Sequence, residues 1–431
     1  MDYKEEMDPY LEEIGANLDN FIENINCLRE TFGYSEIMLR QQNRSALKDL
    51  NEFTKVYTSQ DEKGENIINI PNEKNREYKK LLKKKIRAEK ASKLIPPSYI
   101  ISLISMFDSF LAGLVRCVYN LKQDLLLESK QAFTYREIAN FVSPKEVKKV
   151  IIDSTIDKLF RDSHKEQIEW FEKALEVPLK KFSKWGDFME LTERRNLFVH
   201  ADGIVSMQYI GECTKNNYNL QNIEIGSKLS ADNAYFEKSF GLLYEMGIML
   251  TQILINKLYI DKVSNGNELR DKVFINNVYD LICEKHYEIA INVSNFVRDK
   301  SFKRNNKDKT FIELNLAQAY KWSGNENACK SILKELDTSA MNTDLQIPKK
   351  VLEKKFDEVF SMMKNLGRNS QILTKEAYRE WPIFEKIREK KEFEETFELI
   401  FGERLSIPNS SDINKIETED IQEEALVKVT S

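Results

Sequence analysis

The sequence contains few of the residues that form tight turns, disulfides or metal sites. Glycine and proline number only 14 and 9 in 431 residues, too few to turn the chain between many short strands. The five cysteines are odd in number, far apart and without paired short spacings, so neither a disulfide framework nor a zinc site is expected. Such a chain suits a reducing compartment, and we expect a cytoplasmic location.

An excess of positive charge and long apolar runs are also missing. The formal net charge is −5 at pH 7, which excludes a polycationic nucleic-acid coat and limits any contact with nucleic acid to a local surface. The N-terminus has no basic segment followed by an apolar one, so no signal peptide is predicted. The most apolar run, residues 99–114, contains Asp108 and three serines, and we expect no membrane span there.

Helical periodicity dominates what is present. Apolar residues recur at intervals of three and four over residues 8–29 and 34–53, which predicts an antiparallel pair of helices, and polar residues 54–72 predict a loop. Charged residues make up 31% of the chain, and we predict an all-α fold. The expected parts are an N-terminal helical region (1–94), a helical bundle (95–262), a helical repeat domain (268–405) and a disordered acidic tail (406–431).

Residues 74–93 form a basic segment with ten Lys or Arg against two Glu, and its apolar residues follow a helical stripe. This segment could be a helix that guides RNA phosphates, with contacts at Lys79, Lys80, Lys83 and Lys84. The alternative is a docked helix whose lysine face is only solvated. The next residues, Pro96-Pro97-Ser98, predict the start of a long helix, because proline is tolerated in a first turn.

The stretch 193–203 is the candidate for chemistry. If it is helical, Asn196 and His200 lie one turn apart on the same stripe, and the long side chain of Arg195 reaches toward them. Asp202-Gly203 predicts the helix end. An imidazole transfers protons near neutral pH and a guanidinium matches phosphate oxygens, so this group suits phosphodiester cleavage. The alternative is a buried helix whose histidine makes only a structural hydrogen bond.

The motif Arg195-Asn196-x-x-x-His200, with Glu193 and Arg194 before it as predicted supporting residues, resembles the signature helix of the HEPN superfamily. The resemblance covers roughly residues 95–260 and implies a metal-independent endoribonuclease without a cofactor. In the implied reaction, His200 is the general base or acid toward a ribose 2′-hydroxyl, and Arg195 stabilises charge on the phosphate. Asn196 would hold the backbone or the RNA substrate.

The same resemblance implies partners and supporting residues. HEPN sites are commonly assembled from two motif helices, which implies a homodimer or higher oligomer, and many relatives are toxins or act in antiviral defence. A polar or acidic residue on an earlier helix often faces the motif, so we predict that Asp108 orients Arg195 or His200. Asp108 could instead be exposed on an outer face. The remaining histidines, His164 and His286, are expected to be surface or structural residues.

Several further helices complete the predicted bundle. Ser143 and Glu146 have the spacing of a helix start, and a helix over residues 168–182 is expected to be interrupted or bent near Pro178. Residues 216–230 predict a polar loop, and residues 235–259 predict an apolar closing helix. This pattern is typical of four- or five-helix bundles.

The C-terminal part resembles tetratricopeptide repeats. Leu316-Ala317-x-x-Tyr320-x-x-x-Gly324, followed by Cys329, Leu333 and Leu336, matches one degenerate unit, and residues 287–290 match part of an earlier one. Residues 381–402 predict a terminal capping pair of helices. Such repeats bind a protein or peptide partner on a concave face, which could control the activity. The alternative functions are therefore a non-catalytic scaffold, whose motif supports dimerisation or nucleotide binding, and a partner-binding regulator.

Overall fold

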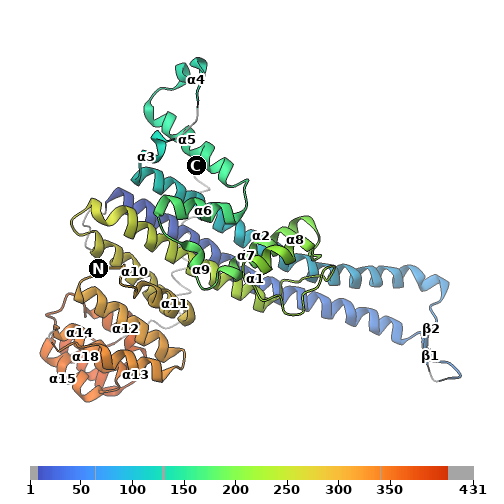
Figure 1. Ribbon diagram of the computed structural model, residues 1–431. Helices are drawn as coiled ribbons and strands as arrows, with labels where there is room; N and C mark the ends of the chain where they lie inside the picture. The colour runs from blue at the N-terminus through green and yellow to red at the C-terminus, as the bar shows by residue number, and fades with distance from the viewer. Residues whose placement is uncertain (1–7, 64, 129–131, 340, 406–431) are drawn as a thin grey trace, which may run out of the picture. The chain divides into compact units, whose positions relative to one another are not determined.

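The computed structural model describes residues 8–63, 65–128, 132–339 and 341–405 (Figure 1). These residues form helices and one two-stranded hairpin, which confirms the all-α prediction. The chain divides into two compact units, residues 1–270 (unit 1) and 271–431 (unit 2), close to the predicted boundary between the bundle (95–262) and the repeat domain (268–405). Residues 8–94 thus share a unit with residues 95–262, and the predicted tail (406–431) lies outside the described residues.

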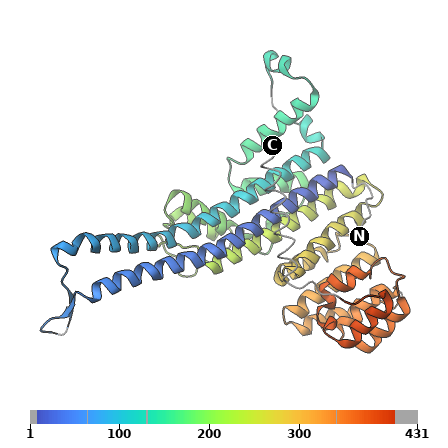
Figure 2. The same ribbon diagram turned by 180° about the vertical axis from the view of Figure 1, so that it is seen from behind.

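Unit 1 is organised on two long antiparallel helices, α1 (Pro9–Lys55) and α2 (Asn75–Leu121), which lie side by side in Figures 1 and 2. They are joined by strands β1 (Thr58–Gln60) and β2 (Asn66–Ile68) and the short helix η1 (Asn72–Lys74). Buried residues of α1 recur every seven positions, at Leu11, Leu18, Ile25, Phe32, Leu39 and Ala46. This spacing keeps one seam of each helix on its partner, as in a coiled coil.

The two predicted helix boundaries in this region are wrong. α1 is one helix through Gly33 where two were predicted, and α2 contains Pro96 and Pro97 in its interior, where a helix start was predicted. A proline inside a helix costs about 3 kcal/mol. Pro96 is itself buried, and the α2 face that follows it is almost wholly buried, so packing offsets the missing backbone hydrogen bonds.

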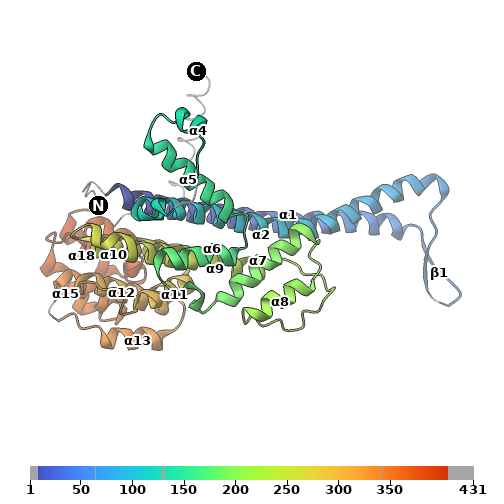
Figure 3. The same cartoon turned by 45° about the horizontal axis from the view of Figure 1, so that its top comes forward.

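Further helical elements complete unit 1 after α2. They are α3 (Asp124–Leu127), α4 (Tyr135–Asn140), α5 (Pro144–Leu159), α6 (His164–Leu175), η2 (Leu179–Lys181), α7 (Trp185–His200), α8 (Met207–Lys215), α9 (Asn233–Leu254), the π-helical turn η3 (Ile255–Tyr259) and η4 (Ile260–Lys262). Helices α5, α7 and α9 contact α2, whereas α4 projects away from the two long helices, as Figure 3 shows. The centre of this core is aromatic: Phe107 on α2 contacts Phe21 on α1 and Phe188 on α7, with ring centroids 5.8 Å apart in both pairs.

The smaller predictions for unit 1 agree with the structure. The helix start at Ser143, the loop over 216–230 and the closing helix are confirmed. The helix predicted over 168–182 is interrupted near Pro178, one of the two predicted outcomes: it ends at Leu175, because Glu176 adopts a left-handed conformation (φ 57°) before Pro178 is reached. Among the described residues one helical stretch, Asn72–Leu121, is long and apolar enough to cross a membrane, but half of its most apolar window is buried, as in a core helix.

Unit 2 is a stack of antiparallel helices. The helix α10 (Gly266–Cys283) contains the boundary, and the helices that follow are α11 (Tyr287–Val297), α12 (Asn306–Trp322), α13 (Glu326–Glu335), α14 (Thr343–Leu352), α15 (Phe356–Leu366), α16 (Lys375–Glu380), η5 (Pro382–Phe384), α17 (Glu385–Arg388) and α18 (Lys391–Phe401). The predicted helix pair around Gly324 is α12 and α13, and Gly324 adopts a positive φ of 88° in the turn. Its relation to tetratricopeptide repeats stays a prediction.

Candidate functional site

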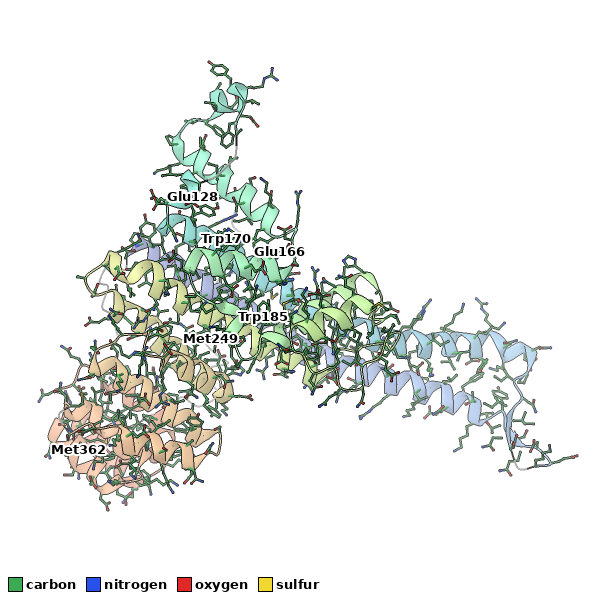
Figure 4. All side chains as sticks on the ribbon, in the orientation of Figure 1. Glu128, Glu166, Trp170, Trp185, Met249 and Met362 are labelled. Carbon is green, nitrogen blue, oxygen red and sulfur yellow. The ribbon has the colours of Figure 1, made fainter. Side chains whose placement is uncertain are left out.

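The motif lies on α7, which is anchored at both ends. At its start, the indole Nε1 of Trp185 (labelled in Figure 4) donates to Asn216 Oδ1 at 2.9 Å, and Phe188 packs against α2. At its end, His200 is the last helical residue, followed by Asp202 (φ 48°) and Gly203 (φ 76°). The predicted helix end at Asp202-Gly203 is therefore confirmed.

The backbone after α7 is held by the segment 226–230. Val205 N donates to the Ser227 carbonyl at 2.9 Å, and Leu229 N donates to the Gly203 carbonyl at 2.9 Å. A small core of Leu197, Val205, Tyr209 and Cys213 fills the space between α7 and α8. The position of the last turn of α7 is thus fixed by a local core and by backbone hydrogen bonds, independently of any ligand.

One flank of α7 is a closed network of buried charge. Arg194 Nε donates to Glu190 Oε1 at 2.6 Å, and Arg194 Nη1 donates to the Ser230 carbonyl at 3.1 Å. The hydroxyls of Tyr209 and Tyr235 donate to the two oxygens of Glu190 at 2.7 and 2.8 Å. Burial, with the adjacent Glu190, raises the pKa of both tyrosines, so both hydroxyls stay protonated and keep donating.

Arg194, predicted as a supporting residue, therefore acts by holding α7 in place, through its hydrogen bonds to Glu190 and to the Ser230 carbonyl. Its guanidinium also lies 3.9 Å from the ring centre of Tyr235, so the planar cation is enclosed on its face as well as its edge. With its side chain 10% exposed, it is not available to an RNA phosphate.

The opposite flank of α7 is open and carries the predicted catalytic residues. Arg195 Nη1 donates to Asn196 Oδ1 at 3.3 Å, and both side chains are half-buried. His200 is exposed, one turn beyond Asn196, and makes no hydrogen bond or ion pair with the described residues. The Nε of Arg195 is buried without a hydrogen-bond partner among the same residues. Geometry thus brings Arg195 and Asn196 together and leaves His200 free to meet a ligand.

Asp108 has a different partner from the predicted one. Its Oδ1 lies 2.9 Å from His164 Nε2, so it orients neither Arg195 nor His200. The His164 side chain is only 11% exposed, which agrees with its predicted structural role. The sequence contained a signal for the place of His164, because the spacing of Ser163 and Glu166 is that of a capping box and puts His164 at the start of a helix, but it contained none for the partner Asp108.

Glu193, another predicted supporting residue, lies between the two flanks. It is half-buried, and burial together with the charge of Glu212 raises its pKa, while the nearby His164 lowers it. Helical spacing puts Glu193 on the same stripe as Asn196 and His200. The open flank is therefore bordered by an acid that holds its proton more tightly than an ordinary glutamate does.

A second charged surface lies on the part of α2 that precedes the prolines. Lys79, Lys80 and Lys83 are exposed and form no ion pair among the described residues, whereas Lys84 Nζ is held at 2.7 Å by Asp49 Oδ2. Three cations were missed by the prediction, Arg76, Arg87 and Lys90, although intervals of three, four and seven residues place them on one helical face with the others. We call the exposed set the basic stripe: Arg76, Lys79, Lys80, Lys83, Arg87 and Lys90.

The basic stripe is uninterrupted by acids. The two glutamates within this part of α2 lie off the stripe and are paired elsewhere, Glu77 with Lys74 at 3.1 Å and Glu89 with Lys85 at 2.5 Å. At about 1.5 Å per residue, the stripe extends for about 20 Å, the length of three or more nucleotides along a single strand.

The described residues hold no group of three or more His, Cys, Asp or Glu side chains arranged around a common metal position. All five cysteines are free thiols. No protein-family model, no curated protein and no solved structure matches the chain.

Proposed function

We propose that the protein is a metal-independent endoribonuclease of the HEPN type, with its site on the open flank of α7. The observation that supports this most is the exposed imidazole of His200, one helical turn from Asn196, whose side-chain oxygen accepts a hydrogen bond from the Arg195 guanidinium. The Arg195 side chain is only half-buried, and a guanidinium matches the oxygen fork of a phosphate.

The proposed reaction needs one base, one acid and one cation. His200 takes the proton of a ribose 2′-hydroxyl, the 2′-oxygen attacks the adjacent phosphorus, and the bond to the 5′-oxygen breaks, leaving a cyclic phosphate. Arg195 stabilises the charge that develops on the phosphate oxygens, and Asn196 holds Arg195 in place. A second copy of the chain in a homodimer supplies another His200, which protonates the departing 5′-oxygen.

The basic stripe serves as the RNA-binding surface in this proposal. It belongs to the same unit as α7, and its unpaired cations attract phosphates without requiring a sequence. The setting we propose is the cytoplasm, in a toxin-like or antiviral defence role, with activity controlled by a protein or peptide partner on the helical repeats of unit 2.

The test is RNA cleavage by the purified full chain, in the presence of a metal chelator. His200→Ala and Arg195→Ala should each lower the rate by about 100-fold or more, the usual contribution of a general base or a charge-stabilising group. Val199→Ala is the matched control, because Val199 is exposed on the same turn and has no ionisable group. Equal cleavage by all four proteins would reject the proposal and favour the non-catalytic scaffold.

A further inference from the structure

Unit 2 contains a groove of about 500 Å³ between the end of α12, the face of α13 and the connection from α14 to α15. Five lysines line it, and we call it the lysine groove: Lys321, Lys330, Lys334, Lys354 and Lys355. Its floor is apolar, because Cys329, Leu333 and Leu352 are buried there in the core of unit 2. A ligand that fits must therefore combine negative charge with apolar side chains.

The acids at the groove are already neutralised. Glu326 pairs with Lys354 at 2.9 Å, and Glu353 pairs with Lys355 at 2.9 Å. Lys330 and Lys334, one turn apart on α13, are exposed and form no ion pair among the described residues. The groove thus presents an excess of positive charge that nothing in this part of unit 2 balances.

Lys321 marks the inner end of the lysine groove. Its ammonium is half-buried and donates to the Leu352 carbonyl at the end of α14. Burial is the main cause that lowers the pKa of Lys321; the charge of Lys354 lowers it too, whereas Cys329 and Glu326 raise it. An anion in the groove would relieve this repulsion, because it would pair with a cation that a backbone oxygen satisfies only in part.

A segment of matching chemistry belongs to the same chain. Residues 412–426 carry Asp412, Glu417, Glu419, Asp420, Glu423 and Glu424 against a single lysine, Lys415. Ile413, Ile416, Ile421 and Leu426 alternate with these acids. We propose that residues 412–426 bind in the lysine groove, with their carboxylates on Lys330 and Lys334 and their apolar side chains on the floor.

The covalent connection favours this occupant over a free peptide. Leu405 packs against the core of unit 2, so the segment begins on the unit that contains the groove. The twelve residues after Leu405, through Glu417, can span about 40 Å at about 3.3 Å each, which exceeds twice the radius of gyration, about 14 Å, of a unit of this size. A tether of this length gives an effective concentration near the millimolar range, so even a weak contact is populated.

The consequence concerns access to the repeats and does not depend on ribonuclease activity. With its own segment bound, the lysine groove is occupied in the isolated chain. A protein or peptide partner that uses the same lysines must displace residues 412–426 first. Its apparent affinity is then its intrinsic affinity multiplied by the fraction of chains whose lysine groove is empty.

The first experiment joins carboxylates to amines in the full chain with a zero-length carbodiimide reagent, followed by mass spectrometry of the peptides. Crosslinks from acids of 412–424 should concentrate on Lys330 and Lys334. They should form within one chain when ¹⁵N-labelled and unlabelled protein are mixed. Crosslinks spread evenly over surface lysines, or formed only between copies, would overturn the proposal.

Charge reversal provides the second experiment. Lys330→Glu with Lys334→Glu should lower the yield of segment-to-groove crosslinks at the remaining lysines about tenfold, because like charges replace opposite ones. Lys364→Glu is the matched control, since Lys364 is exposed on α15 outside the groove. Adding Glu417→Lys and Glu423→Lys to the first variant should restore the contact, now read by proteolytic protection of the segment. Failure to restore protection in a normally folded protein would also overturn the proposal.

Discussion

The two flanks of α7 use the same kinds of residue in opposite ways. On the closed flank, Arg194 and Glu190 satisfy each other and two tyrosine hydroxyls beneath the surface. On the open flank, Arg195 has a single weak partner in Asn196, and His200 has none among the described residues. The difference shows that adjacent arginines in a motif need not share a role. The closed flank holds the helix in place, and the open flank is left available to a ligand.

The same contrast recurs on α2. Lys84 is held by Asp49, whereas Lys83, one residue earlier, extends from the basic stripe without an ion pair. A cation that is already in an ion pair contributes less free energy to binding an RNA phosphate, because the existing ion pair must be broken first. Three predictions test this distinction between satisfied and available charge, and one tests the backbone turn that ends α7; the largest expected effect comes first.

Removing the cation of the closed flank should damage the fold most. Arg194→Met leaves the buried Glu190 carboxylate without its counter-charge, and we expect the free energy of unfolding to fall by about 3–5 kcal/mol. His200→Ala should change it by no more than about 0.5 kcal/mol, because His200 is exposed and unpartnered among the described residues. Chemical denaturation of both variants measures the difference. Similar destabilisation by the two substitutions would mean that the closed flank does not stabilise the fold more than the open flank does.

The end of α7 provides the next test. A Cβ at Gly203 would lie 3.0 Å from the Leu229 carbonyl oxygen, at a φ of 76° that side chains rarely adopt. Gly203→Ala should therefore cost about 1–3 kcal/mol. Gly211→Ala is the control, because Gly211 lies in α8 with open space around its Cβ position, and alanine there should stabilise the helix slightly. Thermal unfolding of both variants gives the sign of each change.

These residues also show how far the sequence could be interpreted. The helix end at Asp202-Gly203 and the turn between Asn196 and His200 follow from local rules, and the structure has both. The closed network does not, because it joins Glu190 to tyrosines 19 and 45 residues farther along the chain. Which of two adjacent arginines is buried depends on those distant partners, and no local pattern contains them.

The long helices illustrate the same limit at the level of the fold. Gly33 and the pair Pro96-Pro97 are local signals for helix ends, and both lie inside continuous helices. The seven-residue spacing of buried positions in α1 was visible in the sequence and would have predicted an uninterrupted helix. Tertiary packing along the α1–α2 seam outweighs the local preference for a break.

The third prediction compares satisfied and available cations on α2. Lys79→Gln with Lys83→Gln should reduce the salt dependence of RNA binding, with a change in slope of about 0.7 for each phosphate that the protein no longer neutralises. Lys84→Gln should change the slope less, because Asp49 already holds that ammonium. Binding measured by fluorescence anisotropy over a range of salt concentrations separates the two. Equal slopes for all variants would mean that the basic stripe does not bind RNA and is only a solvated face of α2.

The smallest expected effect is that of Glu193, which borders the open flank. Burial and Glu212 raise its pKa in the folded protein above that of the unfolded chain, so the folded state binds the proton more tightly. The stabilisation from this proton is full below the unfolded pKa and disappears as pH rises through the folded pKa.

At neutral pH the buried charge of Glu193 therefore destabilises the folded state. Glu193→Gln should raise the melting temperature at that pH, by an amount equivalent to no more than about 1 kcal/mol. The gain should disappear near pH 4, where wild-type Glu193 is itself protonated. Melting temperatures over this pH range test the sign, and a variant that is less stable than wild type at neutral pH would mean that the Glu193 carboxylate is paired within the open flank.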